Sequence, residues 1–93
     1  MRRIERTKAF KKDYQRAVAT PKHRDLENLL PAVIALLATD TALPEKYVDH
    51  LLRGEWKDFR DCHVKPDLVL IYRKSGSDLL QLVRLGSHSE LGF

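Results

Sequence analysis

The spacing of apolar residues changes near residue 56, and this change constrains the fold more than any other feature of the chain. Before it, apolar side chains recur at helical spacing in two stretches: Phe10, Tyr14, Ala17 and Val18, then Leu26, Leu29, Leu30, Val33, Ile34 and Leu37. From Trp56 onward the period falls to two, the spacing of a half-exposed β-strand. Helices followed by consecutive strands are typical of an α+β domain.

The part of the chain before residue 56 predicts a short strand followed by two helices. Residues 2–6 alternate weakly and predict the strand, while Thr7 is a suitable N-cap for the first helix. Thr20-Pro21 signals the start of the second helix, since proline is accepted in a first turn. Pro31 lies inside this second pattern and predicts a kink or a later start. Two short helices joined around Thr20 should form an antiparallel hairpin.

The strand part predicts a small, mainly antiparallel, curved sheet. Its strands cover residues 56–64, 67–73 and 79–85, with turns at Lys65-Pro66 and residues 75–77. Strands with such short connections pair antiparallel. The helical hairpin should cover one face and leave the other for function. Residues 39–55 have no steady period and read as a long, ordered loop, a kind of segment that is often functional.

Length and composition restrict the class of protein. Ninety-three residues, 43% of them hydrophobic, predict one domain over 1–93 with a small core. No run approaches the about 20 apolar residues of a membrane span, and no signal peptide follows the basic start. Cys62 is the only cysteine, which excludes an internal disulfide and a thiolate zinc cage. We therefore expect a cytoplasmic protein.

Positive charge is concentrated at the amino-terminal end. Residues 1–24 hold nine basic and two acidic side chains, a net charge of +7, whereas the whole chain carries +4. This favours a polyanion such as nucleic acid, or an acidic protein partner. A solvated helix face is an equally good reading of a charge run.

Histidines and a carboxylate are the candidates for chemistry. His50, His63 and His88 lie in or beside the loop and strands, and Asp67 follows His63 across a turn. Cleavage of RNA by its own 2′-hydroxyl needs a base, an acid and a cation that offsets phosphorane charge. Imidazole suits the first two roles, because its pKa of about 6.5 is near working pH. Arginine suits the third, and the predicted strands carry three: Arg60, Arg73 and Arg84.

Other readings of these residues stay open. Each histidine could be an ordinary surface or capping residue, and His23 is best read as a surface residue. Three histidines and an aspartate could also hold zinc, although no short histidine spacing supports it. The aromatic side chains Trp56, Phe59 and Tyr72 fit core or sheet packing better than base stacking.

Two motifs bring a family resemblance. Residues 49–72 contain D-H-x-L-x-G-x-W, then R-D-x-H-x-x-P-D, then L-I-Y, and residues 84–88 read R-x-G-S-H. With this combined spacing, the chain closely resembles the YafQ family of addiction-module toxins in the RelE/ParE superfamily. The resemblance covers nearly the whole sequence.

The resemblance implies a RelE-like fold and a ribosome-dependent endonuclease that cuts mRNA in the ribosomal A site without a metal or other cofactor. The family's essential residues fall on five positions: His50, His63, Asp67, His88 and Arg84. His50 and Asp67 would remove or orient the proton. His88 would protonate the leaving group, His63 would position the phosphate, and Arg84 would stabilise its charge.

Partners and departures follow from the same resemblance. A small cognate antitoxin, the 70S ribosome and mRNA are the expected partners, with a monomeric toxin that forms a hetero-oligomer with its antitoxin. Candidate RNA or ribosome contacts are Lys8, Lys11, Lys12, Arg16, Arg60, Arg73 and Phe93. Leu68 stands where the family often has tryptophan, and the tail reads Leu91-Gly92-Phe93 instead of Leu-Phe. A gyrase inhibitor like the ParE branch, or a degenerate toxin that only binds RNA or ribosomes, is the alternative.

Overall fold

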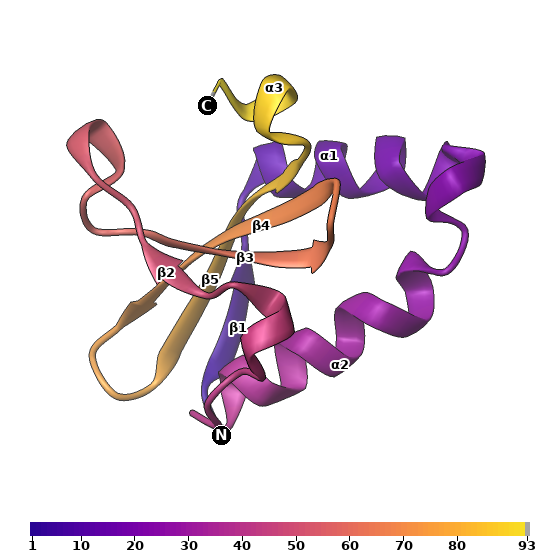
Figure 1. The fold of residues 1–93 in the computed structure, drawn as a ribbon. Coiled ribbons are helices and arrows are strands. Elements are labelled where there is room, and N and C mark those ends of the chain that lie inside the picture. The colour runs from indigo at the N-terminus through magenta and orange to yellow at the C-terminus, as the bar shows by residue number, and fades with distance from the viewer. Residues whose placement is uncertain (93) are drawn as a thin grey trace.

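A five-stranded mixed sheet organises the protein, as seen in a computed structural model that describes residues 1–92 (Figure 1). Its elements are β1 (Arg3–Arg6), α1 (Lys8–Ala19), η1 (Pro21–His23), α2 (Leu26–Ala38), η2 (Glu45–Tyr47), β2 (His50–Leu51), η3 (Gly54–Trp56), β3 (Arg60–Lys65), β4 (Leu68–Ser75), β5 (Leu79–Gly86) and α3 (His88–Leu91). The strand order is β1-β5-β4-β3-β2, and only the β1–β5 pair is parallel. The predicted α+β class and the mainly antiparallel sheet are confirmed.

The first helix continues the edge of the sheet where β1 stops. β1 pairs with β5 only as far as Leu82. Beyond that point Thr7, the predicted N-cap, accepts a hydrogen bond from the Phe10 amide (3.0 Å) and donates one to the Val83 carbonyl (2.7 Å). Asp13 then accepts from the Leu85 amide (3.0 Å). Side chains of α1 therefore satisfy backbone groups that an edge strand would otherwise expose.

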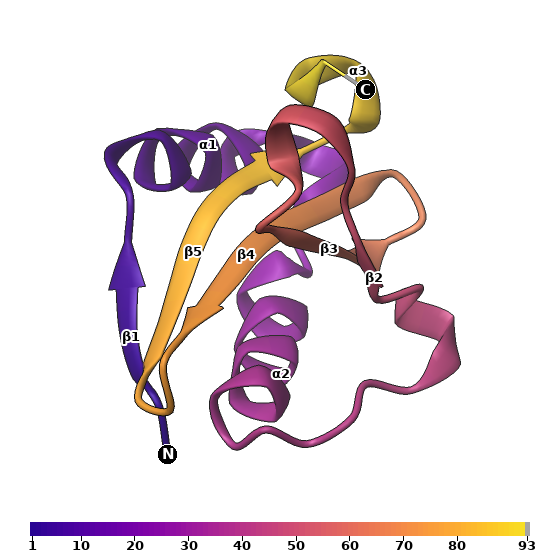
Figure 2. The same ribbon diagram turned by 90° about the vertical axis from the view of Figure 1, so that its left-hand side faces the viewer.

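The second helix differs from the sequence prediction in two ways. Thr20-Pro21 starts the short η1 turn, and α2 begins only at Leu26. Pro31 lies inside α2, which continues to Ala38. In both views α2 runs at a steep angle to α1, so the helices do not lie antiparallel along each other (Figures 1 and 2). Each packs on the sheet instead, which buries more apolar area than the short helices could bury against each other.

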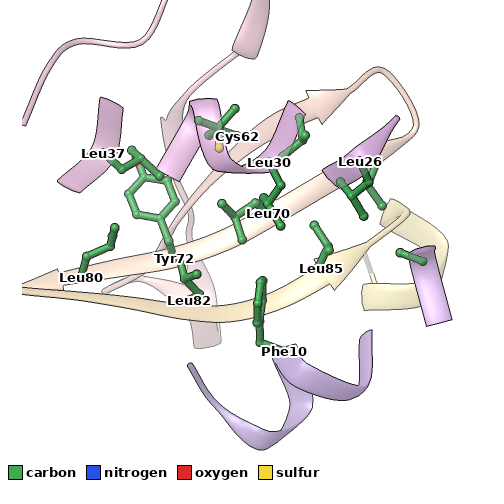
Figure 3. Close-up of a cluster of buried hydrophobic side chains, with 14 of the residues drawn as sticks. Phe10, Leu26, Leu30, Leu37, Cys62, Leu70, Tyr72, Leu80, Leu82 and Leu85 are labelled. Carbon is green, nitrogen blue, oxygen red and sulfur yellow. The ribbon is translucent and has the colours of Figure 1, made fainter. Parts of the chain in front are cut away.

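The main core lies between the helices and one face of the sheet. Both predicted helical stripes point into it, with Phe10, Leu26 and Val33 at most 2% exposed. Alternate residues of the central strands meet them (Figure 3): Cys62, Leu70, Tyr72, Leu80, Leu82 and Leu85. Tyr72 is 1% exposed, which confirms it as a core residue.

The opposite face carries a second, smaller apolar cluster. Val69, Ile71 and Leu91 are buried there. The chain around η3 folds back over this face, closed by a hydrogen bond from the Leu52 amide to the Phe59 carbonyl (2.9 Å). Partly buried side chains pack on the cluster: Leu52, Trp56, Phe59 and Val83. Trp56 therefore belongs to the η3 turn, and the predicted strand start at residue 56 is wrong, because β3 begins at Arg60.

Two features bear on the earlier expectations. No helix within residues 1–92 is long and apolar enough to cross a membrane. Phe93, a candidate RNA contact, lies outside the described residues, so that expectation stays a prediction.

Candidate active site

The short strand β2 places His50 beside a buried carboxylate. His50 is the direct cross-strand neighbour of Asp61 on β3, so both side chains lie on the same face of the sheet. The distance from His50 Nδ1 to Asp61 Oδ1 is 3.0 Å. Asp61 is 1% exposed, whereas about half of the His50 side chain reaches solvent. One end of the imidazole is thus fixed in the protein and the other faces outward.

The contacts of His50 fix which ring nitrogen carries the proton. Nδ1 donates a hydrogen bond to the Val48 carbonyl oxygen at 2.8 Å. A carbonyl oxygen accepts only, and the neighbouring Asp61 carboxylate also demands a donor, so Nδ1 must be protonated. In the neutral ring the lone pair is then on Nε2. His50 is prepared to accept a proton through that atom.

Asp61 is the carboxylate at the centre of the histidine group. Burial raises the pKa of Asp61, and positive charge on His50, His63 and His88 opposes that effect. Its Oδ1 atom accepts no hydrogen bond from the described residues, because the Nδ1 hydrogen of His50 points at Val48. Asp61 Oδ1 is therefore a buried acceptor oxygen beside the His50 ring, 3.0 Å from its Nδ1 atom.

The other two histidines meet at the end of the sheet nearest α3. His63 follows Asp61 by two residues on β3 and therefore lies on the same face. The His63 and His88 rings are 5.2 Å apart between centroids, at an interplanar angle of 65°. His88 is the first residue of α3, which begins with a capping box between Ser87 and Glu90. The fold thus brings together His50, His63 and His88, which lie far apart in the chain.

Asp67 lies apart from this group. It is exposed in the β3–β4 turn, and its Oδ2 is 2.9 Å from Lys22 Nζ of η1. A hydrogen bond from Lys22 holds the pKa of Asp67 below its usual value. Asp67 lines a pocket of about 240 Å³ together with Gly86 and Ser87, which precede His88. Sequence spacing predicted a neighbour of Asp67 in His63, and the ion pair that the structure shows is with Lys22.

Arg84 is engaged by α1. Its guanidinium donates to both oxygens of Asp13, at 2.7 and 3.3 Å, and the side chain is 31% exposed. Asp13 is buried and also accepts from the Leu85 amide. Arg84 is opposite Ile71 on β4, which is in turn opposite Asp61 on β3. It therefore stands in the same row as the site while its charge compensates Asp13.

The other two strand arginines occupy different environments. Arg60 donates to both oxygens of Asp49 at 3.3 Å. Arg73 lies on the face that carries the histidines, with its guanidinium carbon 5.6 Å from the centre of the Phe59 ring, and has no carboxylate partner in the described residues. Of the three, Arg73 is the one whose charge no carboxylate in the described part of the chain offsets.

The basic face of α1 is open to solvent. Its predicted contact residues are all exposed: Lys8, Lys11, Lys12 and Arg16. Arg16 also pairs with Asp13 (3.1 Å) and with Glu90 of α3 (3.5 Å). The Arg16–Glu90 contact joins this helix to the segment that carries His88. The basic surface is therefore continuous with one end of the histidine group.

His23 is not a surface residue, and that prediction is wrong. It is 6% exposed, because η1 folds it inward against α1 and the β3–β4 turn. Its Nδ1 atom has no hydrogen-bond partner within the described residues. His23 lines the same pocket as Asp67. A charged neighbourhood in the sequence gave no sign of this burial.

Sequence reasoning missed two carboxylates of the site. Asp61 was within reach, since strand alternation places it on the face of His63 two residues away. Asp49 pairs with Arg60 and Tyr72, and no local pattern reveals such partners. The zinc reading is not supported, because residues 1–92 contain no group of three or more histidine, cysteine or acidic side chains placed to hold a metal ion.

Comparisons with known proteins find relatives over nearly the whole chain. A family model described as "Bacterial toxin of type II toxin-antitoxin system, YafQ" matches residues 2–92. The mRNA interferase toxin YafQ of Escherichia coli K12 is 38% identical over 90 residues, which cover 97% of this chain and 95% of that protein. A copper-bound mutant toxin from Helicobacter pylori has a TM-score of 0.90 at 41% identity, covering 98% of this chain and 99% of the other. The toxin of the Escherichia coli DinJ-YafQ complex has a TM-score of 0.84 at 39% identity, covering 98% of both chains.

Proposed function

The chain belongs to the YafQ family of type II toxin–antitoxin toxins, and from this premise we propose that it is a ribosome-dependent mRNA endonuclease. Relatives named mRNA interferase toxin support the class of reaction. The observation that carries the proposal is the convergence of His50, His63 and His88 around the buried Asp61. The reaction class is attack of a ribose 2′-hydroxyl on the adjacent phosphorus.

His50 is the general base of this reaction. Its Nε2 lone pair takes the proton of the 2′-hydroxyl, and the 2′-oxygen forms a bond to phosphorus. The hydrogen bond from Nδ1 to the Val48 carbonyl keeps Nε2 free for this step. Asp61, 3.0 Å from Nδ1, stabilises the imidazolium that forms.

His88 is the general acid. It gives a proton to the 5′-oxygen as the bond from that oxygen to phosphorus breaks, which leaves a 2′,3′-cyclic phosphate and a 5′-hydroxyl. Its neighbour His63 lies between the two ends of the site and donates to a phosphate oxygen. Since imidazole supplies both proton transfers, no metal ion is needed.

Arginine side chains offset the negative charge that develops on the phosphorane. Arg73 has no carboxylate partner in the described part of the chain and so carries a full positive charge on this face. Arg84 contributes less than the family resemblance implies, because Asp13 holds its guanidinium. Asp67 lines the same pocket as Gly86 and Ser87. There it orients the RNA strand and does not transfer a proton.

The partners of the proposed toxin are the ribosome and an antitoxin. The exposed basic face of α1 binds ribosomal RNA phosphates, so Lys11→Glu combined with Lys12→Glu should weaken ribosome binding and flatten its salt dependence. A solved relative forms the DinJ-YafQ toxin–antitoxin complex. A small antitoxin that folds on this chain is the corresponding partner here, and it would stabilise a small domain by mass action.

Primer extension on a message translated in a purified system tests the activity. Wild-type protein should cut the message when ribosomes are present, and cutting should survive a zinc-selective chelator that leaves the ribosomes their Mg²⁺. His50→Ala and His88→Ala should each abolish cutting while the circular dichroism spectrum stays that of the wild type. Growth arrest with intact messages and a loss of DNA supercoiling would instead identify a gyrase inhibitor. Ribosome binding without cutting would identify a degenerate toxin.

A further inference from the structure

The backbone that holds His50 is strained and weakly supported by its own strand. Val48, whose carbonyl accepts the hydrogen bond from His50 Nδ1, has φ +49° and ψ +46°, a left-handed conformation that is rare for a β-branched residue. β2 is only two residues long, and both Leu51 within it and Val48 shortly before it are more than half exposed. Burial of β2 therefore cannot keep His50 in place. Some other contact must do so.

That contact is made by Asp49 on the opposite face of the sheet. Successive residues of an extended chain point to opposite faces, so Asp49 faces the helices while His50 faces the site. One Asp49 oxygen accepts a hydrogen bond from the Tyr72 hydroxyl. Arg60 donates to both oxygens, through Nε and Nη2, at 3.3 Å each. The carboxylate thus has three donors from two strands.

The two partners of Asp49 are themselves fixed. Tyr72 is 1% exposed, in the core under α2, and is the cross-strand neighbour of Arg60. Burial raises the pKa of Tyr72 most, and the hydrogen bond to the Asp49 carboxylate raises it further. The Tyr72 hydroxyl therefore stays protonated and donates. These three side chains, Asp49, Tyr72 and Arg60, form a clamp that ties the strained segment to the rigid centre of the sheet. Arg60, a predicted RNA contact, also has this structural use.

We propose that Asp49, held by Tyr72 and Arg60, is a positioning residue that keeps Val48 left-handed and thereby sets the orientation of the His50 ring. This inference rests on the proposed role of His50 as the base. Asp49 acts through the backbone on either side of it and does not touch the reacting atoms. Without the clamp the Val48 carbonyl turns away, the Nδ1 hydrogen turns to Asp61 Oδ1 at 3.0 Å, and Nε2 leaves the position from which it takes the 2′-hydroxyl proton.

The test uses two substitutions that preserve shape. Tyr72→Phe removes only the hydroxyl, and Asp49→Asn removes the charge that attracts Arg60. NMR of histidine-labelled protein reports, through the chemical shift of the His50 Nδ1 hydrogen, which oxygen accepts it. We expect a bond to the Val48 carbonyl in the wild type and a moved shift in each variant, because Asp61 Oδ1 then becomes the acceptor. In the cleavage assay kcat should fall about tenfold to a hundredfold with little change in KM, since a displaced base costs rate and not binding.

Matched controls separate the clamp from general effects of the same changes. Tyr14→Phe removes a hydroxyl from α1, and Asp58→Asn neutralises an exposed carboxylate near β3; both should keep the wild-type Nδ1–H shift of His50 and the wild-type kcat. An unchanged Nδ1–H shift in Tyr72→Phe and Asp49→Asn would overturn the proposal, as would a rise in KM at constant kcat. The NMR measurement needs no RNA. If the wild type fails to cut messages, the proposed function is lost while the positioning role is still decided.

Discussion

Replacement of Asp13 by alanine should destabilise the protein more than the loss of any other polar side chain in α1. The Asp13 carboxylate is 4% exposed and accepts from the Arg84 guanidinium, the Arg16 guanidinium and the Leu85 amide. Asp13→Ala leaves the buried Leu85 amide without a partner, at a cost of about 1–3 kcal/mol. The Arg84 pair adds only about 1 kcal/mol, because that side chain is 31% exposed and regains water.

The expected total is therefore about 2–4 kcal/mol, a large share of the roughly 5–14 kcal/mol typical of a domain this size. Asp13→Asn keeps an oxygen for the Leu85 amide and loses only the charge, so its free energy of unfolding should fall by about 1 kcal/mol. Urea denaturation at neutral pH measures both values. Asp58→Ala, an exposed carboxylate, serves as the control and should change little.

The pH dependence gives an independent check on Asp13. Burial acts to raise the pKa of Asp13, but the hydrogen bonds from Arg84 and Leu85 outweigh it, and the pKa lies below the usual value of an aspartate. A lowered folded pKa means that this stabilisation is present above the unfolded value of about 3.9 and is lost as pH falls through the folded value. The gap between wild type and Asp13→Asn should narrow below about pH 4. Equal stability of Asp13→Asn and Asp13→Ala at neutral pH would refute the role of the Leu85 amide.

Two further outcomes are expected. Val48→Gly should have a free energy of unfolding about 1 kcal/mol higher than Val48→Ala in urea denaturation, because an exposed left-handed position suits glycine best. A glycine variant less stable than the alanine variant would contradict this prediction. Burial raises the pKa of the Cys62 thiol to about 12. A thiol reagent should therefore not label the native protein at mildly alkaline pH, but should label it fully in concentrated urea. Rapid labelling of the native protein would show that the core opens.

Much of the fold could be predicted because it follows from local patterns. Thr7 marks the start of α1, since a threonine oxygen satisfies a free amide of the first turn. The apolar stripes of both helices point into the core as their spacing requires. Boundaries failed where tertiary contacts outweigh local signals. Trp56 fits the alternation of the strand that follows it, yet it lies in the η3 turn and packs on the second apolar cluster.

Part of the site was also accessible from the residue types alone. The motifs around His50, His63 and His88 selected the three imidazoles that the fold brings together. The same motifs pointed to Asp67 and Arg84, which the structure shows in ion pairs with Lys22 and Asp13. Sequence spacing predicts the face on which a residue lies. It does not predict which oppositely charged side chain will pair with that residue.

The sequence by itself determined the order of elements, the faces that become core, and the histidines suited to proton transfer, because these depend on neighbours within a few positions. Only the tertiary structure decided that Asp61 is the carboxylate among the histidines, that His23 is buried, and that Asp49 ties β2 to Tyr72. Those results depend on strand register and on contacts between residues up to dozens of positions apart. Such contacts form only when the whole chain packs, since each one gains from the burial that the others supply.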